Sequence, residues 1–255
     1  MPTFKPLNII AIATLAATLA AGTLRAEDSS GNALPKDRAG FDAMIRDYIM
    51  QHPEVLREAL LKLEQDEQLE NTKRILRGYK NELYASGSPQ IGAKDAKVKI
   101  VEFYDYNCQY CRASYPKVRA FLKANPDVTL VMKDVASFGP DSEAVARLAL
   151  AAHQQGKFEP LNDALLALKG KATEARALEI AEKLGLDIAK LKKDAQSASI
   201  ADELKRTKSL ADSLNANITP LFVIGHNGIS GAPEDLEAQL GEAVGQIRKS
   251  GCDVC

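Results

Sequence analysis

The sequence predicts an α/β fold in which a strand, a helix and a strand are followed by a helical insertion and then by two strands and a closing helix. Three observations predict this order. An apolar run over residues 98–104 leads into Cys108-Gln109-Tyr110-Cys111, where a strand ends and a helix begins. Residues from about 141 to 214 show only helical periodicity. A second apolar run over residues 219–225 precedes a turn.

The first half of this pattern is a strand-helix-strand unit. The run Val98–Tyr104 is apolar except at two positions, which favours a central strand. A helix is expected over residues 108–124, with Pro116 bending it. Residues 128–132 read Val-Thr-Leu-Val-Met and predict the second strand.

The second half begins after the helical insertion at about 141–214. Residues 219–225 predict a strand, residues 226–228 (His-Asn-Gly) a hairpin turn, and residues 229–230 a short returning strand. The periodic segment 233–249 is expected to close the domain as a helix.

Residues 1–26 have the features of a secretory signal peptide. Lys5 supplies a basic start, and the apolar stretch 7–21 is shorter than the roughly 20 residues of a membrane span. Cleavage is expected after Gly22 or Ala26, with an uncleaved anchor as the alternative. No cysteine lies directly after the apolar stretch, so nothing supports a lipid anchor. Export from a bacterial cell would place the protein in the periplasm, where disulfides persist.

Between the signal and the main domain the sequence predicts a polar linker over residues 27–39 and a helical arm over residues 40–86. Pro53 is well placed as the first residue of a new helix. Three leucines recur at a spacing of seven: Leu69, Leu76 and Leu83. The arm has too few apolar residues for its own core, so it is expected to pack on a second copy, as a homo-oligomer, or on its own main domain. Residues 86–89 (Ser-Gly-Ser-Pro) are expected to mark the boundary of that domain.

The charge balance argues against nucleic acid as a partner. Loss of the signal peptide removes Lys5 and Arg25 and leaves 31 basic against 34 acidic residues, a formal charge of −3. No basic patch of the density needed for nucleic-acid binding occurs in the chain. His52, His153 and His226 lie far apart without metal-ligand spacing and are expected to be surface or structural residues.

The Cys108-Gln109-Tyr110-Cys111 motif predicts thiol chemistry. Two cysteines separated by two residues can close a small disulfide ring, and Cys108 would lie at a helix N-terminus, where unpaired N–H groups and the macrodipole favour an anion. A lowered pKa would make Cys108 a nucleophile and a good leaving group. A structural disulfide and half of a metal site are the alternatives, but the order strand, CxxC, helix favours a redox role. The only cofactor implied is the Cys108–Cys111 disulfide itself.

Two segments resemble the signatures of the DsbA family of thioredoxin-fold thiol–disulfide oxidoreductases: residues 102–111 (EFYDYNCQYC) and residues 218–225 (ITPLFVIG). The resemblance covers roughly residues 90–250 and implies a thioredoxin-like fold with an inserted all-helical domain, preceded by the helical arm. The arm itself, residues 40–86, resembles the N-terminal extension of the ScsC-like branch, whose members are tied to copper tolerance and can be oligomeric.

The resemblance implies a role for each of five residues. Cys108 resembles the exposed nucleophile that forms a mixed disulfide with a substrate, and Cys111 resembles the resolving thiol. Pro220 resembles the family's cis-proline facing the dithiol, beside which Thr219 offers its backbone to an extended substrate. An ordinary trans proline that starts an edge strand is the alternative. Glu102 resembles the buried acid that helps Cys111 lose its proton, with a solvent-facing strand glutamate as the alternative.

The dipeptide Gln109-Tyr110 departs from the family pattern, because it contains neither the histidine of strong oxidants nor the proline common in relatives. Without an imidazolium beside Cys108, the reduction potential is expected to be less oxidising. Oxidation and isomerisation therefore both stay open. The expected partners are unfolded or misfolded exported proteins and a membrane or periplasmic redox partner. An oligomeric arm would favour isomerisation by raising the effective concentration of dithiols around one client.

Cys252 and Cys255 form a second CxxC in the tail, residues 251–255, for which the family pattern does not account. A surface-exposed local disulfide is the favoured interpretation. Soft-metal capture is the sharper one, since thiolates suit Cu(I), and a four-thiolate zinc site that unites both CxxC pairs is a third. The alternative function for the whole chain is therefore a copper-binding chaperone that uses CxxC thiolates.

Overall fold

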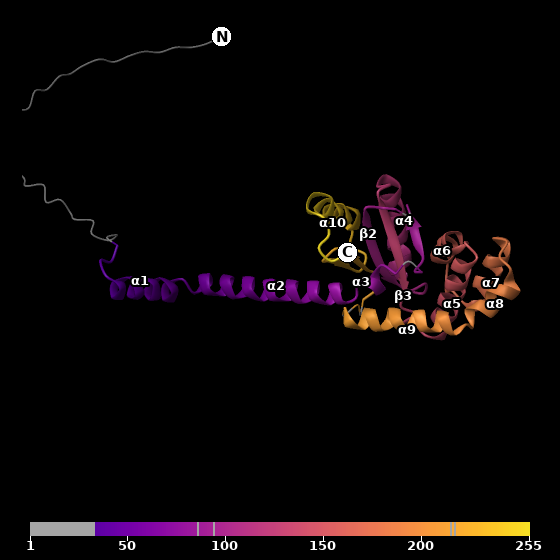
Figure 1. Cartoon of the computed structure of the whole chain (residues 1–255), viewed down its shortest axis with the longest axis horizontal. Coiled ribbons are helices and arrows are strands. Elements are labelled where there is room, and N and C mark those ends of the chain that lie inside the picture. The colour runs from indigo at the N-terminus through magenta and orange to yellow at the C-terminus, as the bar shows by residue number, and fades with distance from the viewer. Residues whose placement is uncertain (1–33, 86, 94, 215, 217) are drawn as a thin grey trace, which may run out of the picture. The chain divides into compact units, whose positions relative to one another are not determined.

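The computed structural model describes residues 34–85, 87–93, 95–214, 216 and 218–255 (Figure 1). The predicted signal peptide, residues 1–26, and the predicted linker up to residue 33 lie outside the described residues. Three helices precede the sheet: α1 (Arg38–Gln51), α2 (Pro53–Gly78) and α3 (Lys80–Leu83). None of the described helices combines the length and the apolar character needed to cross a membrane.

The remaining elements follow the predicted order, with one additional strand. The first half holds β1 (Gln90–Gly92), β2 (Val98–Tyr104), α4 (Gln109–Ala124) and β3 (Val128–Asp134). The insertion holds α5 (Pro140–Gln154), α6 (Phe158–Leu166), α7 (Glu174–Lys183), α8 (Ile188–Ala195) and α9 (Ala198–Ser213). The chain then returns to the sheet with β4 (Leu221–Ile224), β5 (Asn227–Ser230) and α10 (Leu236–Ser250).

The five strands form one sheet in the order β1-β3-β2-β4-β5, so the prediction of a central position for β2 is confirmed. Strands β2 and β3 are parallel, with Val98 opposite Val128 and Tyr104 opposite Asp134, and the other pairings are antiparallel. Side chains alternate along β2, so its two faces contact different helices. Ile100 and Tyr104 join the core that includes α4, α10 and the insertion. Val101 and Phe103 join a second core on the other face.

The second core corrects the predicted extent of the arm. Leu76 at the end of α2 and Leu83 at the end of α3 are 2% and 0% exposed and pack with Val101 and Phe103. The spacing of seven residues thus reflects, at these two leucines, the docking of the end of α2 and of α3 on the sheet. The boundary expected at residues 86–89 therefore lies too late, and the compact unit that contains the sheet begins at Leu60.

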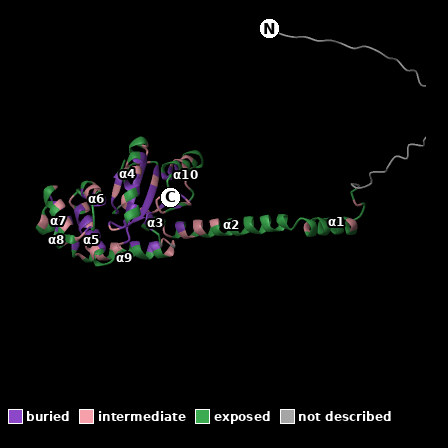
Figure 2. Cartoon of the chain, turned by 180° about the vertical axis from the view of Figure 1, so that it is seen from behind, coloured by how far each residue is buried: buried purple, intermediate pink, exposed green. Residues whose placement is uncertain are grey.

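The residues before this unit are mainly exposed, as the green colour of α1 in Figure 2 shows. The side chain of Asp37 caps α1 by accepting a hydrogen bond of 2.7 Å from the N–H of Gly40, so the helix starts slightly before the predicted residue 40. The large apolar side chains of α1 and of the first turns of α2 are exposed, among them Phe41, Met44, Ile45, Tyr48, Leu56, Leu60 and Leu63.

One strand in the first half of the sheet domain and two boundaries in the second half differ from prediction. Strand β1 has only three residues, too few to show a periodicity, and was not predicted. The turn between β4 and β5 consists of Gly225 and His226, because Ile224 already pairs with Asn227. Gly225 has a φ of +57°, which favours glycine at this first loop position. Helix α10 begins at Leu236, since the N–H of Leu236 closes a turn on the carbonyl of Pro233.

Candidate active site

Cys108 is the N-cap residue of α4, and its sulfur lies between two parts of the chain. The Sγ atom accepts a hydrogen bond of 3.3 Å from the backbone N–H of Cys111. It also donates a hydrogen bond of 3.3 Å to the backbone carbonyl of Thr219. Both cysteines are free thiols, so the structure describes the reduced dithiol. The sequence predicted an exposed nucleophile, but Cys108 is only 2% exposed because the Thr219 segment covers it.

The two thiols have opposite electrostatic environments. Hydrogen bonds with the side chain of Cys111, the largest cause, and with the side chain of Thr219 and backbone N–H groups lower the pKa of Cys108 to about 6. Burial is the main cause that raises the pKa of Cys111, followed by its hydrogen bond to Cys108 and by the negative charge of Glu102. The site therefore separates a thiolate at Cys108 from a protonated thiol at Cys111.

Glu102 lies on β2 and is fully buried, which excludes the alternative of a solvent-facing glutamate. Neither of its carboxylate oxygens has a hydrogen-bond partner among the described residues. Burial, and then the charge of Cys108, raises the pKa of Glu102 to about 8. A buried carboxyl group with a pKa near neutrality can take up or release a proton at physiological pH, and its charge affects the pKa of Cys111.

Thr219 and Pro220 lie directly before β4, at the same end of the sheet as Cys108. The peptide bond between them is cis, and Thr219 is largely buried. A cavity of about 370 Å³ opens beside the Cys108 sulfur and is also lined by Thr219. Its rim holds Tyr110, Phe138 and Ile218, three large apolar side chains that are more than half exposed.

Sequence reasoning did not assign roles to the residues that fix the loop before Cys108. Asp105 accepts hydrogen bonds from the backbone N–H of Asn107 (2.6 Å) and from the hydroxyl of Ser142 (2.8 Å) in α5. Asn107 in turn exchanges two hydrogen bonds with the backbone of Ala172 in the insertion, at 2.8 and 3.0 Å. Arg112 donates to the carbonyls of Tyr106 and of residues in the loop before α7. Asp105 and Asn107, two polar residues between the buried strand β2 and the CxxC, were the feature of the sequence that could have indicated this role.

Cys252 and Cys255 are joined in a disulfide, as the favoured interpretation of the tail predicted. Both are half-buried, so the expected surface exposure was wrong, because the tail packs on the second core. Cys108 and Cys111 form no common cluster with the tail pair, and the described part of the chain contains no group of three or more potential metal ligands from His, Cys, Asp or Glu.

Comparison with known protein families agrees with this geometry. The thioredoxin family profile matches residues 85–242, which is more than half of the chain. A second profile, described as the N-terminal domain of the copper resistance protein ScsC, matches residues 37–70. The chain therefore belongs to the thioredoxin family. Within this family it is a DsbA/ScsC-like protein, as the relatives below indicate, and the predicted fold class is confirmed.

Curated relatives share parts of the chain. The chain is 30% identical over 152 residues to the Na(+)/H(+) antiporter NhaA 3 of Salinispora tropica, a match to 58% of this chain and 23% of that protein. It is 28% identical over 161 residues to the probable disulfide bond formation protein D of Bacillus anthracis, covering 58% of this chain and 74% of that one. The chain thus spans about a quarter of the first of these relatives.

Solved structures match about two thirds of the chain. A thioredoxin-like oxidoreductase from Silicibacter pomeroyi is 37% identical with a TM-score of 0.64, and the match covers 67% of this chain and 98% of that one. The catalytic domain of Proteus mirabilis ScsC is 26% identical with a TM-score of 0.61, and covers 68% of this chain and 97% of that one.

Proposed function

We propose that this protein catalyses thiol–disulfide exchange in exported proteins, with Cys108 as the attacking thiol and Cys111 as the resolving thiol. The observation that carries the proposal is the position of the Cys108 sulfur at the N-terminus of α4, with its pKa lowered to about 6. At pH 7 this sulfur is mainly thiolate, the form that attacks disulfides.

In the reducing direction, the thiolate of Cys108 attacks one sulfur of a client disulfide. A mixed disulfide forms, and the second client sulfur leaves as a thiolate that takes up a proton. Cys111 then attacks the Cys108 sulfur and the client thiol is released. The client disulfide has been reduced, and Cys108 and Cys111 have been oxidised to a disulfide. Glu102 supports the second step as the acceptor of the Cys111 proton, because it is buried near the dithiol and has a pKa of about 8.

Thr219 and Pro220 position the client. The carbonyl of Thr219 faces the Cys108 sulfur at 3.3 Å, so an extended client segment that pairs with this backbone places its cysteine beside Cys108. The exposed apolar side chains around the adjoining cavity, Tyr110, Phe138 and Ile218, supply contacts for the unfolded segments of a client.

Of the two reactions, isomerisation is the one proposed, because association of the arms favours it. The apolar side chains of α1 and of the first turns of α2 are exposed in the single chain, and a helix of this kind gains stability from a partner surface. Association of these exposed helix faces of the arm in a homo-oligomer buries this surface and brings several dithiols to one misfolded client. The match of residues 37–70 to the ScsC N-terminal domain supports the same assignment.

The periplasm is the proposed location, supported by the signal-like residues 1–26 and by the similarity to DsbA and ScsC proteins. Isomerisation leaves the dithiol reduced when a second client thiol attacks the mixed disulfide. A membrane or periplasmic partner is needed to reduce Cys108 and Cys111 again whenever Cys111 resolves that mixed disulfide instead. No cofactor beyond this cysteine pair is proposed.

Copper binding is the second candidate, favoured by the description of the N-terminal profile as a copper resistance domain. Cys108 and Cys111 are free thiols and suit Cu(I) as ligands. In this role the protein would hold copper and would not need to turn over disulfides.

Reduction of insulin with and without bound Cu(I) tests the two candidates. The wild-type protein is expected to reduce insulin, Cys108→Ser to abolish the reaction, and Cys111→Ser to accumulate mixed disulfides with client proteins. Equal trapping by both variants would contradict the assigned roles. Tight Cu(I) binding without turnover of insulin would favour the copper chaperone.

A further inference from the structure

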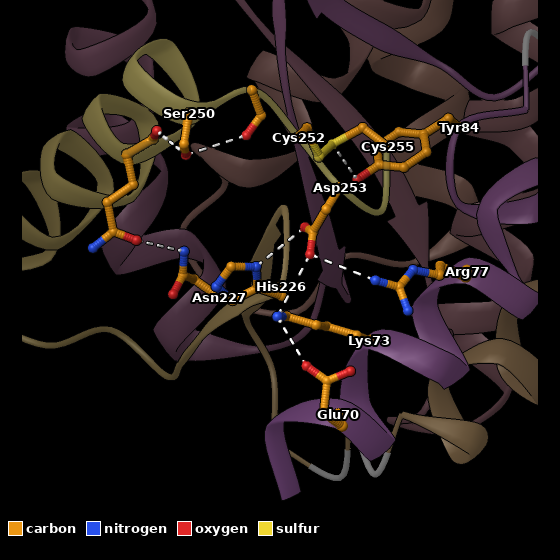
Figure 3. A network of polar contacts seen from close by, with 12 residues as sticks. Glu70, Lys73, Arg77, Tyr84, His226, Asn227, Ser250, Cys252, Asp253 and Cys255 are labelled. Carbon is orange, nitrogen blue, oxygen red and sulfur yellow. Dashed lines mark hydrogen bonds and ion pairs between the residues drawn. A yellow bond between two sulfur atoms is a disulfide. The ribbon is translucent and has the colours of Figure 1, made fainter. Parts of the chain in front are cut away.

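The Cys252–Cys255 disulfide takes no part in the proposed exchange at Cys108, yet the tail that carries it is firmly docked (Figure 3). Val254, between the two cysteines, is 2% exposed and packs in the second core with Leu76 and Leu83. Burial of this side chain fixes the tail by hydrophobic contact, independently of the sulfur bridge.

Asp253 fixes the tail a second time, by charge. Its carboxylate lies 3.3 Å from Nδ1 of His226, 3.6 Å from Nζ of Lys73 and 3.7 Å from a terminal nitrogen of Arg77, as the dashed lines in Figure 3 show. A disulfide between cysteines three positions apart restrains the unfolded chain less than one that closes a long loop, so the docking of the tail does not depend mainly on the bridge. Because Val254 and Asp253 hold the tail in place, both thiols stay near each other when the bridge opens, and the bridge can form again.

The surroundings of Cys255 stabilise a thiolate. The Tyr84 hydroxyl lies 3.3 Å from the Cys255 sulfur, and burial raises the pKa of Tyr84 to about 12, so the hydroxyl keeps its proton and donates to the sulfur. Cys255 also borders a cavity of about 710 Å³ whose described lining includes Lys80, Lys97 and Lys99 and no carboxylate side chain. Positive charge and a donated hydrogen bond both favour a thiolate at this position.

Cys252 borders a different cavity, of about 310 Å³, between the β4–β5 turn and the end of α10. His226 and Gly225 line this cavity. A Cβ atom at position 225 would lie in ordinary contact, 3.7 Å from the Cys252 sulfur, so the β4–β5 turn lies beside this sulfur without crowding it. In thiol–disulfide exchange the better leaving group departs faster. The asymmetry therefore directs attack to Cys252 and makes Cys255 the leaving thiolate.

We propose that Cys252–Cys255 is a second redox site, at which a low-molecular-weight thiol attacks Cys252 through the cavity beside His226. A bond forms between the incoming thiolate and the Cys252 sulfur, the Cys252–Cys255 bond breaks, and its electron pair stays on Cys255, facing Tyr84. A second molecule of the thiol then attacks the sulfur that the first small molecule contributed to the mixed disulfide, and Cys252 leaves as a thiolate. The small molecule leaves as its disulfide, and two electrons remain on the tail dithiol.

The test uses the full chain with Cys108→Ser and Cys111→Ser, so that only the tail can react and the outcome does not depend on the proposed function. Reduced glutathione is the probe, and samples are quenched with acid, alkylated and mapped by mass spectrometry. We expect the glutathione adduct on Cys252. Tyr84→Phe is expected to slow opening by roughly threefold to tenfold, because it removes the hydrogen bond to the leaving thiolate.

Tyr79→Phe is the matched control. Its hydroxyl contacts the hydroxyl of Ser213 at 2.9 Å and not the tail, so opening is expected at the parent rate. An adduct on Cys255, or equal rates in the Tyr84 and Tyr79 variants, would overturn the proposal. So would a tail that stays closed under glutathione concentrations that reduce the Cys108–Cys111 disulfide of the unmodified chain. The site of the adduct decides the question even where Tyr84→Phe fails to fold.

Discussion

The thiol of Cys108 donates a hydrogen bond to the backbone carbonyl of Thr219 across 3.3 Å, although the two residues are 111 positions apart in the chain. When Cys108 ionises, it loses the proton that makes this contact, and it keeps the hydrogen bond that it accepts from the N–H of Cys111. The thiolate thus faces a backbone carbonyl at the position where a client segment is expected to pair. Deprotonation and client binding therefore act on the same pair of groups.

The reactivity of Cys108 is expected to rise with pH through a midpoint near 6, since its pKa is lowered to about that value. The rate of alkylation by iodoacetamide, measured between pH 4 and pH 9, checks this. In Cys111→Ala the midpoint should move upward, because the hydrogen bond with the Cys111 side chain is the largest cause of the shift. A midpoint near the value of an ordinary thiol, about 8.5, would contradict the environment described for Cys108.

Glu102 is expected to make the reduced protein less stable as pH rises. Its pKa in the folded protein, about 8, lies above the ordinary value of 4.5, so the folded state binds more protons between these two values. The contribution of Glu102 to the free energy of unfolding is thus largest below pH 4.5 and is lost as pH rises to 8, by up to about 1.4 kcal/mol per pH unit. Urea unfolding from pH 5 to pH 9 measures the slope. Glu102→Gln should flatten it, and an unchanged slope in that variant would count against the assignment.

The same substitution is expected to slow the release of clients. If Glu102 accepts the proton of Cys111, Glu102→Gln should lower the rate at which a mixed disulfide on Cys108 is resolved, by about 100-fold or more. Stopped-flow measurement with a glutathione mixed disulfide on Cys108 gives this rate directly. The alkylation rate of Cys108 in the same variant is the control for damage to the site. A resolution rate equal to that of the wild type would remove Glu102 from the mechanism.

The arm is expected to make the mature protein an oligomer. Light scattering should give a multiple of the monomer mass, and a shortened chain that starts at Leu60 should give the monomer mass. The cut is placed there because a chain that starts at Ser88 would also remove Leu76 and Leu83 from the second core. Leu56→Lys should weaken association, whereas Arg57→Ala, at a neighbouring exposed position, should not. A monomeric full-length protein would refute the oligomer.

Leucines of the same helical region are expected to differ in their effect on stability. Leu76→Ala and Leu83→Ala should each lower the free energy of unfolding by about 2–5 kcal/mol, because both side chains are fully packed. Leu63→Ala, where the side chain is 54% exposed, should cost less than about 0.5 kcal/mol in the shortened chain that starts at Leu60. Denaturant unfolding of the three variants checks the contrast. Equal losses would place Leu63 in the core as well.

Long apolar runs made most of the fold predictable. Strand β2 and the CxxC were identified from adjacent residues, since Val98–Tyr104 is nearly all apolar and Cys108 follows within four residues. The opposite holds for β1, whose three residues form a strand only because β3 offers a free edge. Leu76 and Leu83 show a second limit: the same spacing suits a helix that docks on a sheet and a helix that pairs with its copy.

The two thiols of the site were predictable from the sequence, whereas the residues that position them and line the adjoining cavity were less so. Arg112 binds backbone carbonyls of the insertion, and a carbonyl leaves no mark on the sequence. Phe138 and Ile218 lie far from the CxxC along the chain, and only the fold brings them to the rim of the same cavity. Buried Glu102 was identified by resemblance alone, because a strand glutamate has the same pattern on either face.

The distance along the chain between Cys108 and Thr219 has a consequence for synthesis and export. The Cys108-to-Cys111 segment leaves a ribosome or a translocation channel before helices α5 to α9 and well before the Thr219 carbonyl. Until β4 pairs with β2, the thiol at Cys108 has no cover and is open to any oxidant or stray cysteine in its surroundings. A chain whose β4 is not yet in place thus exposes a thiol that the folded domain buries, so wrong pairings of Cys108 form most readily at that stage.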